Sequence, residues 1–329
     1  MKSLVYGLLI HLGRNLWSDS DVADHLRCDV GVWNEITEHL AECGGNMLVI
    51  DLAEGLAYPS HPELAVRGSW SPERMAEEIA RLKAMGIEAI PKLNFSSCHD
   101  AWLKDYSREL STPEYYRVCS DLIRDTANIF GRPRFIHLGW DEEDYPNQKD
   151  YPYIAIRQGE NWWKDMLFTC EAVRDAGSRP WIWSDREWLF KDEFVKNCPR
   201  DVLQSHWYYG PFFGPDRQQR DDSRMAESMK KLGGHVDEHL TLSTYAELEE
   251  AGFDQICCGS NYYYLNNFPD MVRHCLKSVS ATHLKGFLNA PWHVVDRSDN
   301  GIHRGIYLNA CDQLAGARGI VRNWCANVA

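Results

Sequence analysis

The chain has 329 residues, enough for one large α/β barrel with a sizeable core. Its net charge of −13, without a basic stripe, argues against nucleic acid or an anionic membrane as a partner. No apolar run reaches the roughly 18 residues of a membrane span, and the eleven cysteines include no Cys-x-x-Cys pair, so we expect free thiols in a reducing, cytoplasmic setting.

Eight apolar runs are predicted to be strands. The first run is followed by His11 and Arg14 and has no small-residue cleavage site, which indicates a strand rather than a signal peptide. The predicted strands are Leu4–Leu12, Asn46–Leu52, Ile87–Leu93, Pro133–Ile136, Pro180–Trp183, Val202–Tyr209, Asp254–Gly259 and Leu284–Ala290.

Helical patterns alternate with these strands. Ser71-Pro72 and Thr112-Pro113 are typical helix starts, and Gly44-Gly45 and Gly86 are typical helix ends. The predicted helices are Val32–Cys43, Pro72–Met85, Thr112–Phe130, Asn161–Ala176, Arg224–Leu232, Thr244–Ala251, Pro269–Val279 and Arg304–Ala315.

The alternation predicts a single (β/α)8 TIM barrel over residues 1–329. An open doubly wound sheet is the alternative, but no Gly-x-Gly-x-x-Gly follows the first strand to support a dinucleotide fold. A long polar loop over 211–224 follows the sixth strand, so we expect it on the C-terminal face of the barrel. The sequence leaves open whether that loop closes over a site.

One stretch, His137-Leu138-Gly139-Trp140-Asp141-Glu142-Glu143-Asp144, brings four carboxylates to the end of the fourth strand. Burying a carboxylate is costly unless a specific partner receives it. An acidic loop or helix start is the structural interpretation. We favour a functional one, because an apolar strand carries the acids to one end of the fold.

Polar and aromatic residues also follow the other strands, which predicts a pocket at one rim of the barrel. A metal site has little support because the rim histidines show no recurring ligand spacing. The rim residues are His11, Arg14, Asp51, Glu54, Lys92, Asn94, Cys98, His99, Trp183, Asp185, His206, Trp207, residues 261–266, Trp292 and His293.

Acids beside aromatic side chains suit glycoside hydrolysis, in which two carboxyl groups usually flank the scissile bond. Adjacent strand residues point to opposite sides, so Asp141 and Glu142 are not expected to be a facing acid and nucleophile. They fit a reaction in which a 2-acetamido group of the substrate attacks the anomeric carbon. One acid then protonates the leaving oxygen, and the other stabilises the acetamido N–H.

The chain resembles glycoside hydrolase family 20, the β-N-acetylhexosaminidases, along nearly its whole length. The family ends its fourth strand with His-x-Gly-Gly-Asp-Glu, and here 137–142 reads His-Leu-Gly-Trp-Asp-Glu. Residues 8–14 resemble the family's first strand, and 91–99 resemble its third strand with the loop that follows. Residues 260–266 resemble its seventh-strand segment, which ends in Tyr-Leu-Asp.

The resemblance implies a retaining, substrate-assisted exo-enzyme that releases N-acetylglucosamine or N-acetylgalactosamine from an oligosaccharide or glycoconjugate without a cofactor or metal. It implies Glu142 as general acid/base and Asp141 as the residue that orients the acetamide. Arg14 would hold sugar hydroxyls, and Tyr264 would bind the acetamide oxygen, although the Tyr-Tyr-Tyr run leaves its register uncertain by one. The other implied substrate-binding residues are His99, Trp183, Trp207, Trp292 and Asn266.

Several positions depart from the family pattern, and they leave the identity of the sugar open. Trp140 replaces the second Gly, Asn266 replaces an Asp that binds sugar hydroxyls, and Val294 stands where an acid is common. The family's usual N-terminal α/β domain is also expected to be missing, which makes this a divergent, barrel-only relative. The remaining departures are Asp51, Glu54 and Lys92.

Two other functions remain open at this point. One is a different retaining exo-β-glycosidase, similar to a galactosidase, with Asp51, Glu54 or Asp185 as a separate nucleophile. The other is a carbohydrate-binding barrel without turnover, although such a protein has no need of a buried general acid. The sequence also leaves a homodimer open.

Overall fold

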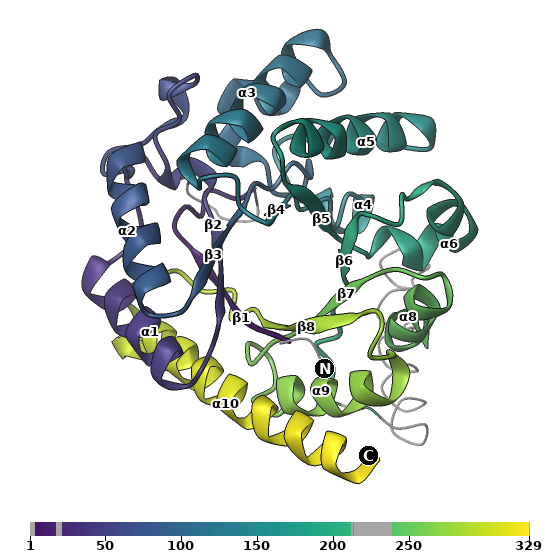
Figure 1. The fold of residues 1–329 in the computed structure, drawn as a ribbon. Coiled ribbons are helices and arrows are strands. Elements are labelled where there is room, and N and C mark those ends of the chain that lie inside the picture. The colour runs from purple at the N-terminus through teal and green to yellow at the C-terminus, as the bar shows by residue number, and fades with distance from the viewer. Residues whose placement is uncertain (1–3, 18–21, 212, 214–238, 329) are drawn as a thin grey trace.

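The computed structural model describes residues 4–17, 22–211, 213 and 239–328. Eight parallel strands close into a barrel in chain order, with the helices outside (Figure 1). The predicted (β/α)8 TIM barrel is therefore confirmed. The strands are β1 (Val5–His11), β2 (Met47–Asp51), β3 (Glu88–Lys92), β4 (Phe135–His137), β5 (Arg179–Trp183), β6 (Leu203–Ser205), β7 (Gln255–Gly259) and β8 (Leu284–Asn289).

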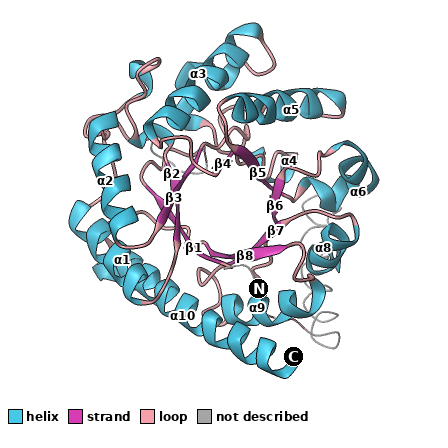
Figure 2. Cartoon of the chain, in the orientation of Figure 1, coloured by secondary structure: helices cyan, strands magenta, loops and turns pink. Residues whose placement is uncertain are grey.

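The helices form an outer ring around the strands (Figure 2). Two predicted helix starts are capped: Ser71 accepts a hydrogen bond from the N–H of Arg74, and Thr112 accepts one from the N–H of Tyr115. Among the described residues, no helix is both long and apolar enough to cross a membrane. The α-helices are α1 (Val30–Glu42), α2 (Pro72–Ala84), α3 (Pro113–Ile129), α4 (Tyr145–Gln148), α5 (Glu160–Asp175), α6 (Arg186–Asn197), α8 (His239–Glu250), α9 (Asn267–Ser278) and α10 (Ile302–Val328).

Several elements differ from the sequence prediction. The sixth strand is only three residues long, although Trp207 still forms an isolated parallel bridge with Cys258. The last helix runs past Gly316 and Gly319 to Val328, because α10 packs along α1 and α9 and this contact offsets the low helix propensity of glycine. Helix α6, which is kinked at Phe190, and the short helix α4 were not predicted, and α8 begins five residues before the predicted Thr244. The helix predicted over 224–232 and most of the 211–224 loop lie outside the described residues.

The barrel interior changes from apolar to polar between two neighbouring levels of side chains. Residues two apart in a strand point to the same side. On β1 to β4 the apolar level holds Leu9, Val49, Ile90 and Phe135. Two residues further along, register partners form what we call the polar row: His11, Asp51, Lys92 and His137. This row lies at the C-terminal ends of the strands, where active sites of such barrels are built.

Candidate active site

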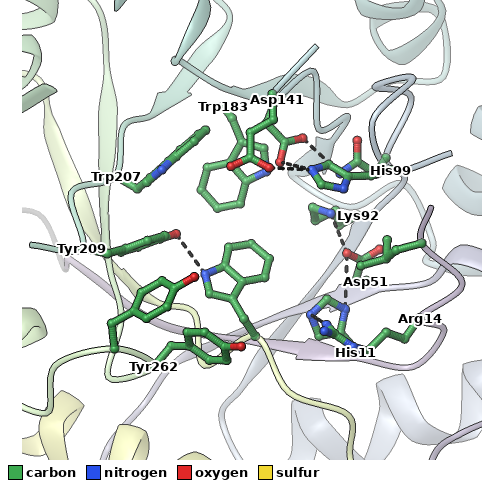
Figure 3. Close-up of a pocket in the computed structure, with 15 residues that line it drawn as sticks. His11, Arg14, Asp51, Lys92, His99, Asp141, Trp183, Trp207, Tyr209 and Tyr262 are labelled. Atoms are coloured by element: carbon green, nitrogen blue, oxygen red, sulfur yellow. Dashed lines mark hydrogen bonds and ion pairs between the residues drawn. The ribbon is translucent and has the colours of Figure 1, made fainter. Parts of the chain in front are cut away.

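A pocket of about 300 Å³ opens at the C-terminal ends of the strands. Charged side chains gather on one side of it and aromatic side chains on the other (Figure 3). Of the nine residues predicted to act in catalysis or binding, seven line it. The lining residues are His11, Arg14, Leu16, Asp51, Lys92, Asn94, His99, Asp141, Glu142, Trp183, Trp207, Tyr209, Tyr262, Tyr263 and Trp292.

Asp141 and Glu142 meet at a single histidine. Nε2 of His99 lies 3.2 Å from Oδ2 of Asp141 and 3.2 Å from Oε2 of Glu142. Asn94 donates a hydrogen bond of 3.0 Å to the other oxygen of Asp141. The Asp141 side chain is 10% exposed and that of Glu142 is 39% exposed, so Asp141 lies deeper and Glu142 faces the mouth of the pocket.

The expectation that the two acids point to opposite sides is wrong. Strand β4 ends at His137, so Asp141 and Glu142 belong to the loop that follows it. Glu142 has a φ of +58°, a left-handed backbone that is rare outside glycine. This turn brings both carboxylates to the same imidazole, so the two acids lie side by side in the pocket.

The same loop explains why one of the family's two glycines can be replaced. Gly139 has a φ of +74°, and a Cβ there would lie 2.0 Å from Oδ1 of Asn94, so a side chain has no room. Trp140 also has a positive φ, +71°, but its indole points into the shell around the barrel. It packs edge-on against Trp162 and donates a hydrogen bond to Thr169.

A buried ion network fixes the residue after Glu142. Arg157 lies 4.2 Å from the ring centre of Trp140 and donates to both oxygens of Glu143. Its guanidinium also reaches Asp165 at 3.2 Å and the carbonyl oxygen of Phe95 at 2.7 Å. Arg157 therefore joins the loop after β3, which carries His99, to the loop after β4, which carries the acids.

Replacing Arg157 with methionine should lower the free energy of unfolding by about 3–5 kcal/mol, because Glu143 and Asp165 would be left buried without a cation. Urea denaturation followed by circular dichroism measures this. The matched control is Arg117→Met, since Arg117 pairs with Glu114 on the surface and should matter by no more than about 1 kcal/mol. Equal losses in the two variants would contradict the assigned role of Arg157.

Asp141 and His99 shift each other's pKa in opposite directions. Burial alone would raise the pKa of Asp141, but His99, Lys92 and the hydrogen bond from Asn94 outweigh it and lower the pKa to about 2. Burial alone would lower the pKa of His99, but Cys98, Asp141 and Glu142 raise it well above its usual value. Asp141 and His99 therefore form an ion pair across the acidic and neutral pH range.

This ion pair should stabilise the fold within a defined pH window. Asp141 has a lowered pKa in the folded state, so its contribution is present above about 3.8 and is lost as pH falls towards 2. His99 has a raised pKa, so its contribution is present below 6.5 and is lost at alkaline pH.

The His99→Gln variant should raise the pKa of Asp141 by about 1–3 pH units, because a cation beside a carboxylate lowers its pKa by that amount. An NMR titration of the aspartate carboxyl carbons measures the change. His25→Gln, which alters an exposed histidine, serves as the control. An unchanged titration of Asp141 in His99→Gln would contradict the ion pair.

The opposite wall of the pocket is aromatic, and its tryptophans come from or just after three strands. The ring centres of Trp183 and Trp207 are 5.4 Å apart, and those of Trp183 and Trp292 are 5.8 Å apart. Tyr209 accepts a hydrogen bond of 3.0 Å from the indole N–H of Trp292. Such faces suit a sugar ring or an N-acetyl group.

The remaining wall is built by the polar row and Arg14. Lys92 forms an ion pair of 2.5 Å with Asp51, and His11 lies 3.5 Å from the same carboxylate oxygen. Burial raises the pKa of Asp51 despite the neighbouring Lys92. Burial, together with Arg14 and Lys92, lowers the pKa of His11 well below its usual value, so a neutral His11 can accept from Arg14 at 3.4 Å.

Two predicted binding residues lie outside the pocket lining. Tyr264 and Asn266 are exposed at the start of α9, while Tyr262 and Tyr263 line the pocket instead. The tyrosines that reach the pocket therefore lie one and two positions before Tyr264, the first of these within the stated uncertainty of one residue. Tyr209 was not predicted. It stands two residues beyond Trp207 in extended chain, a spacing that could have identified it.

The ligand atoms of Cys98, His99 and Glu142 lie within 4.8 Å of one another, close enough to hold a metal ion. His99 is already paired with two carboxylates, and burial raises the pKa of the Cys98 thiol to about 12. The absence of a metal in the reaction stays a prediction.

No protein-family model and no curated protein sequence matches the chain. The fold, however, is similar to that of solved β-N-acetylhexosaminidases. A GH20 exo-β-N-acetylglucosaminidase from Vibrio harveyi superposes over 95% of this chain and 54% of its own, with a TM-score of 0.62 and 13% identity. The β-N-acetylhexosaminidase from Bacteroides fragilis superposes over 94% of this chain and 65% of its own (TM-score 0.59, 15% identity).

Dispersin B superposes over 96% of this chain and 98% of its own, with a TM-score of 0.59 and 15% identity. This chain thus spans between about half and two thirds of the length of the Vibrio and Bacteroides proteins, and nearly all of Dispersin B. The resemblance to glycoside hydrolase family 20 is confirmed at the level of the fold: this chain has the fold of the family's catalytic barrel.

Proposed function

We propose that this protein is an exo-acting β-N-acetylhexosaminidase that works by a retaining, substrate-assisted mechanism on an oligosaccharide or glycoconjugate. The observation that carries the proposal is the contact of Asp141 and Glu142 with one histidine, opposite an aromatic wall. A volume of about 300 Å³ is at the small end for ligand pockets and suits one terminal sugar. A cytoplasmic location and a homodimer remain predictions.

The proposed first step breaks the bond between the anomeric carbon and the leaving oxygen. The acetamide oxygen of the substrate attacks the anomeric carbon, and Glu142 gives its proton to the leaving oxygen. Asp141, ionised beside His99, accepts the acetamide N–H and stabilises the positive charge that develops on the oxazolinium. Water then attacks the anomeric carbon, the bond between that carbon and the acetamide oxygen breaks, and the water gives a proton to Glu142. Two displacements at the same carbon retain its configuration.

A second candidate is a conventional retaining glycosidase with a separate nucleophile. Of the three carboxylates considered, Asp51 lines the pocket, which supports this reading. Glu54 accepts backbone hydrogen bonds from Arg14 and Asn15, and Asp185 accepts one from the N–H of Glu142. Neither carboxylate is among the residues that line the pocket, so neither is placed to act as the nucleophile.

The deciding experiment compares turnover of the 4-nitrophenyl β-glycosides of N-acetylglucosamine, N-acetylgalactosamine, glucose and galactose. Turnover of the acetamido sugars alone, with strong inhibition by a thiazoline mimic of the oxazolinium, is the expected result. Turnover of the plain sugars would favour the separate nucleophile. In that case Asp51→Ala should lose turnover and regain it with azide. No turnover of any of the four substrates would contradict both proposed enzymatic activities and favour a carbohydrate-binding protein.

A further inference from the structure

The ion pair between Lys92 and Asp51 is unusual for the inside of this barrel. The two side chains are 2% and 7% exposed, and they stand directly above the apolar level that contains Val49 and Ile90. They are neighbours in the register of β2 and β3, so the barrel itself holds them in contact. Together with His11 they form the floor of the pocket beside the acids.

Stability of the fold does not account for this pair. Removing two charges from water is costly, and replacing a buried ion pair with apolar residues of similar size is often neutral or stabilising. The level directly below on β1 to β4 holds only apolar side chains, which shows that this part of the barrel packs without charges. A pair kept at the one level that borders the pocket therefore points to a ligand.

The pair also has hydrogen-bonding capacity left for a ligand. Lys92 has three N–H donors, and one of them is used by Oδ2 of Asp51. In the described part of the chain, Oδ1 of Asp51 makes no hydrogen bond, and Arg14 has no carboxylate within ion-pair distance. An acceptor between two cationic donors matches sugar hydroxyls, each of which both donates and accepts.

We infer that Lys92 and Asp51, with Arg14 at their edge, recognise the ring hydroxyls of the terminal sugar and thereby select the sugar that is cleaved. This inference rests on the proposed function. The acids occupy the end of the pocket where the bond is cleaved, and the aromatic wall suits the N-acetyl group. The hydroxyls on carbons 3, 4 and 6 of the same ring then face the polar row. The carboxylate that recognises the hydroxyls thus comes from β2. It does not come from positions 266 and 294, where the family commonly has acids and this chain has Asn266 and Val294.

The test compares kcat/KM for the better 4-nitrophenyl N-acetyl-β-hexosaminide with its 3-deoxy, 4-deoxy and 6-deoxy analogues. In the wild type, kcat/KM for at least one deoxy analogue should be roughly 10- to 150-fold lower than for the parent substrate, the range expected for hydrogen bonds to charged groups. The double variant Asp51→Leu/Lys92→Met leaves no unpaired charge. In this variant, removal of the same hydroxyl from the substrate should lower kcat/KM by less than about threefold. Equal losses in both proteins, or no loss in the wild type, would overturn the inference.

Controls separate this inference from the proposed function. Silence of the wild type on both parent acetamido glycosides would refute the proposed function, whereas turnover without a hydroxyl effect refutes only the inference. Asp105→Asn/Lys83→Met, which alters exposed residues, should keep the wild-type pattern. If the double variant unfolds, the variant Asp51→Asn replaces it, because asparagine has the shape of aspartate. It should still reduce the ratio of kcat/KM between the parent substrate and its deoxy analogue. If turnover is slow, the same comparison is made with the affinities of the thiazoline inhibitor and its deoxy analogues for the wild type and the variant.

Discussion

Replacing Glu142 with glutamine should lower kcat on glycosides with poor leaving groups by roughly 10²- to 10⁴-fold, the usual contribution of a positioned general acid. Glutamine has the same shape but cannot give a proton to the leaving oxygen. The side chain is 39% exposed and faces the pocket, so the fold should survive. Steady-state rates on alkyl and 4-nitrophenyl N-acetylhexosaminides measure the effect, which should be smaller for the nitrophenyl substrate.

The matched control for Glu142 is Asp144→Asn. Asp144 belongs to the same acidic motif but caps α4 through the N–H of Asn147, a role that asparagine fills equally well. This variant should keep wild-type turnover. Wild-type rates in Glu142→Gln on both substrates would remove Glu142 from the mechanism.

Replacing Asp141 with asparagine should lower kcat by roughly 10²- to 10³-fold, by analogy with the loss of other preorganised electrostatic groups. The variant loses the negative charge that faces the developing oxazolinium. The affinity for the thiazoline inhibitor should fall along with the rate, because the inhibitor mimics that charged intermediate. Both are measured by steady-state kinetics on the same protein preparation.

The outcome for Asp141 also separates the two proposed enzymes. A conventional glycosidase with Asp51 as nucleophile does not need the charge of Asp141 to stabilise an acetamide. An unchanged rate in Asp141→Asn, together with weak thiazoline inhibition, would therefore support Asp51 as the nucleophile and contradict the substrate-assisted mechanism.

The barrel could be predicted from the sequence because its signals are local. Apolar runs such as 47–50 and caps such as Ser71 and Thr112 act within a few residues, and the structure bears them out. The end of α10 could not be predicted this way. Its last turns are held by packing against helices that are far away in the sequence.

The site was predictable where the strand ends determine it, and less so where loops do. Trp183 and Lys92 end their strands, and their place follows from the barrel. Tyr264 lies in a loop whose turn decides which tyrosine reaches the pocket, and the sequence does not contain that geometry. The pairing of Lys92 with Asp51 depends on a register between residues 41 positions apart.

The polar row lies between the residues that close the barrel and the residues that carry out the chemistry, so evolution can change these two groups independently. Below it, apolar levels close the barrel, and beyond it, the loop after β4 carries the chemistry. Because its members share one level, exchanging two of them alters what the floor can bind without moving a strand or the acids. A family built on this plan could diversify its substrates through a few inward-facing positions while its rate-determining groups stay fixed.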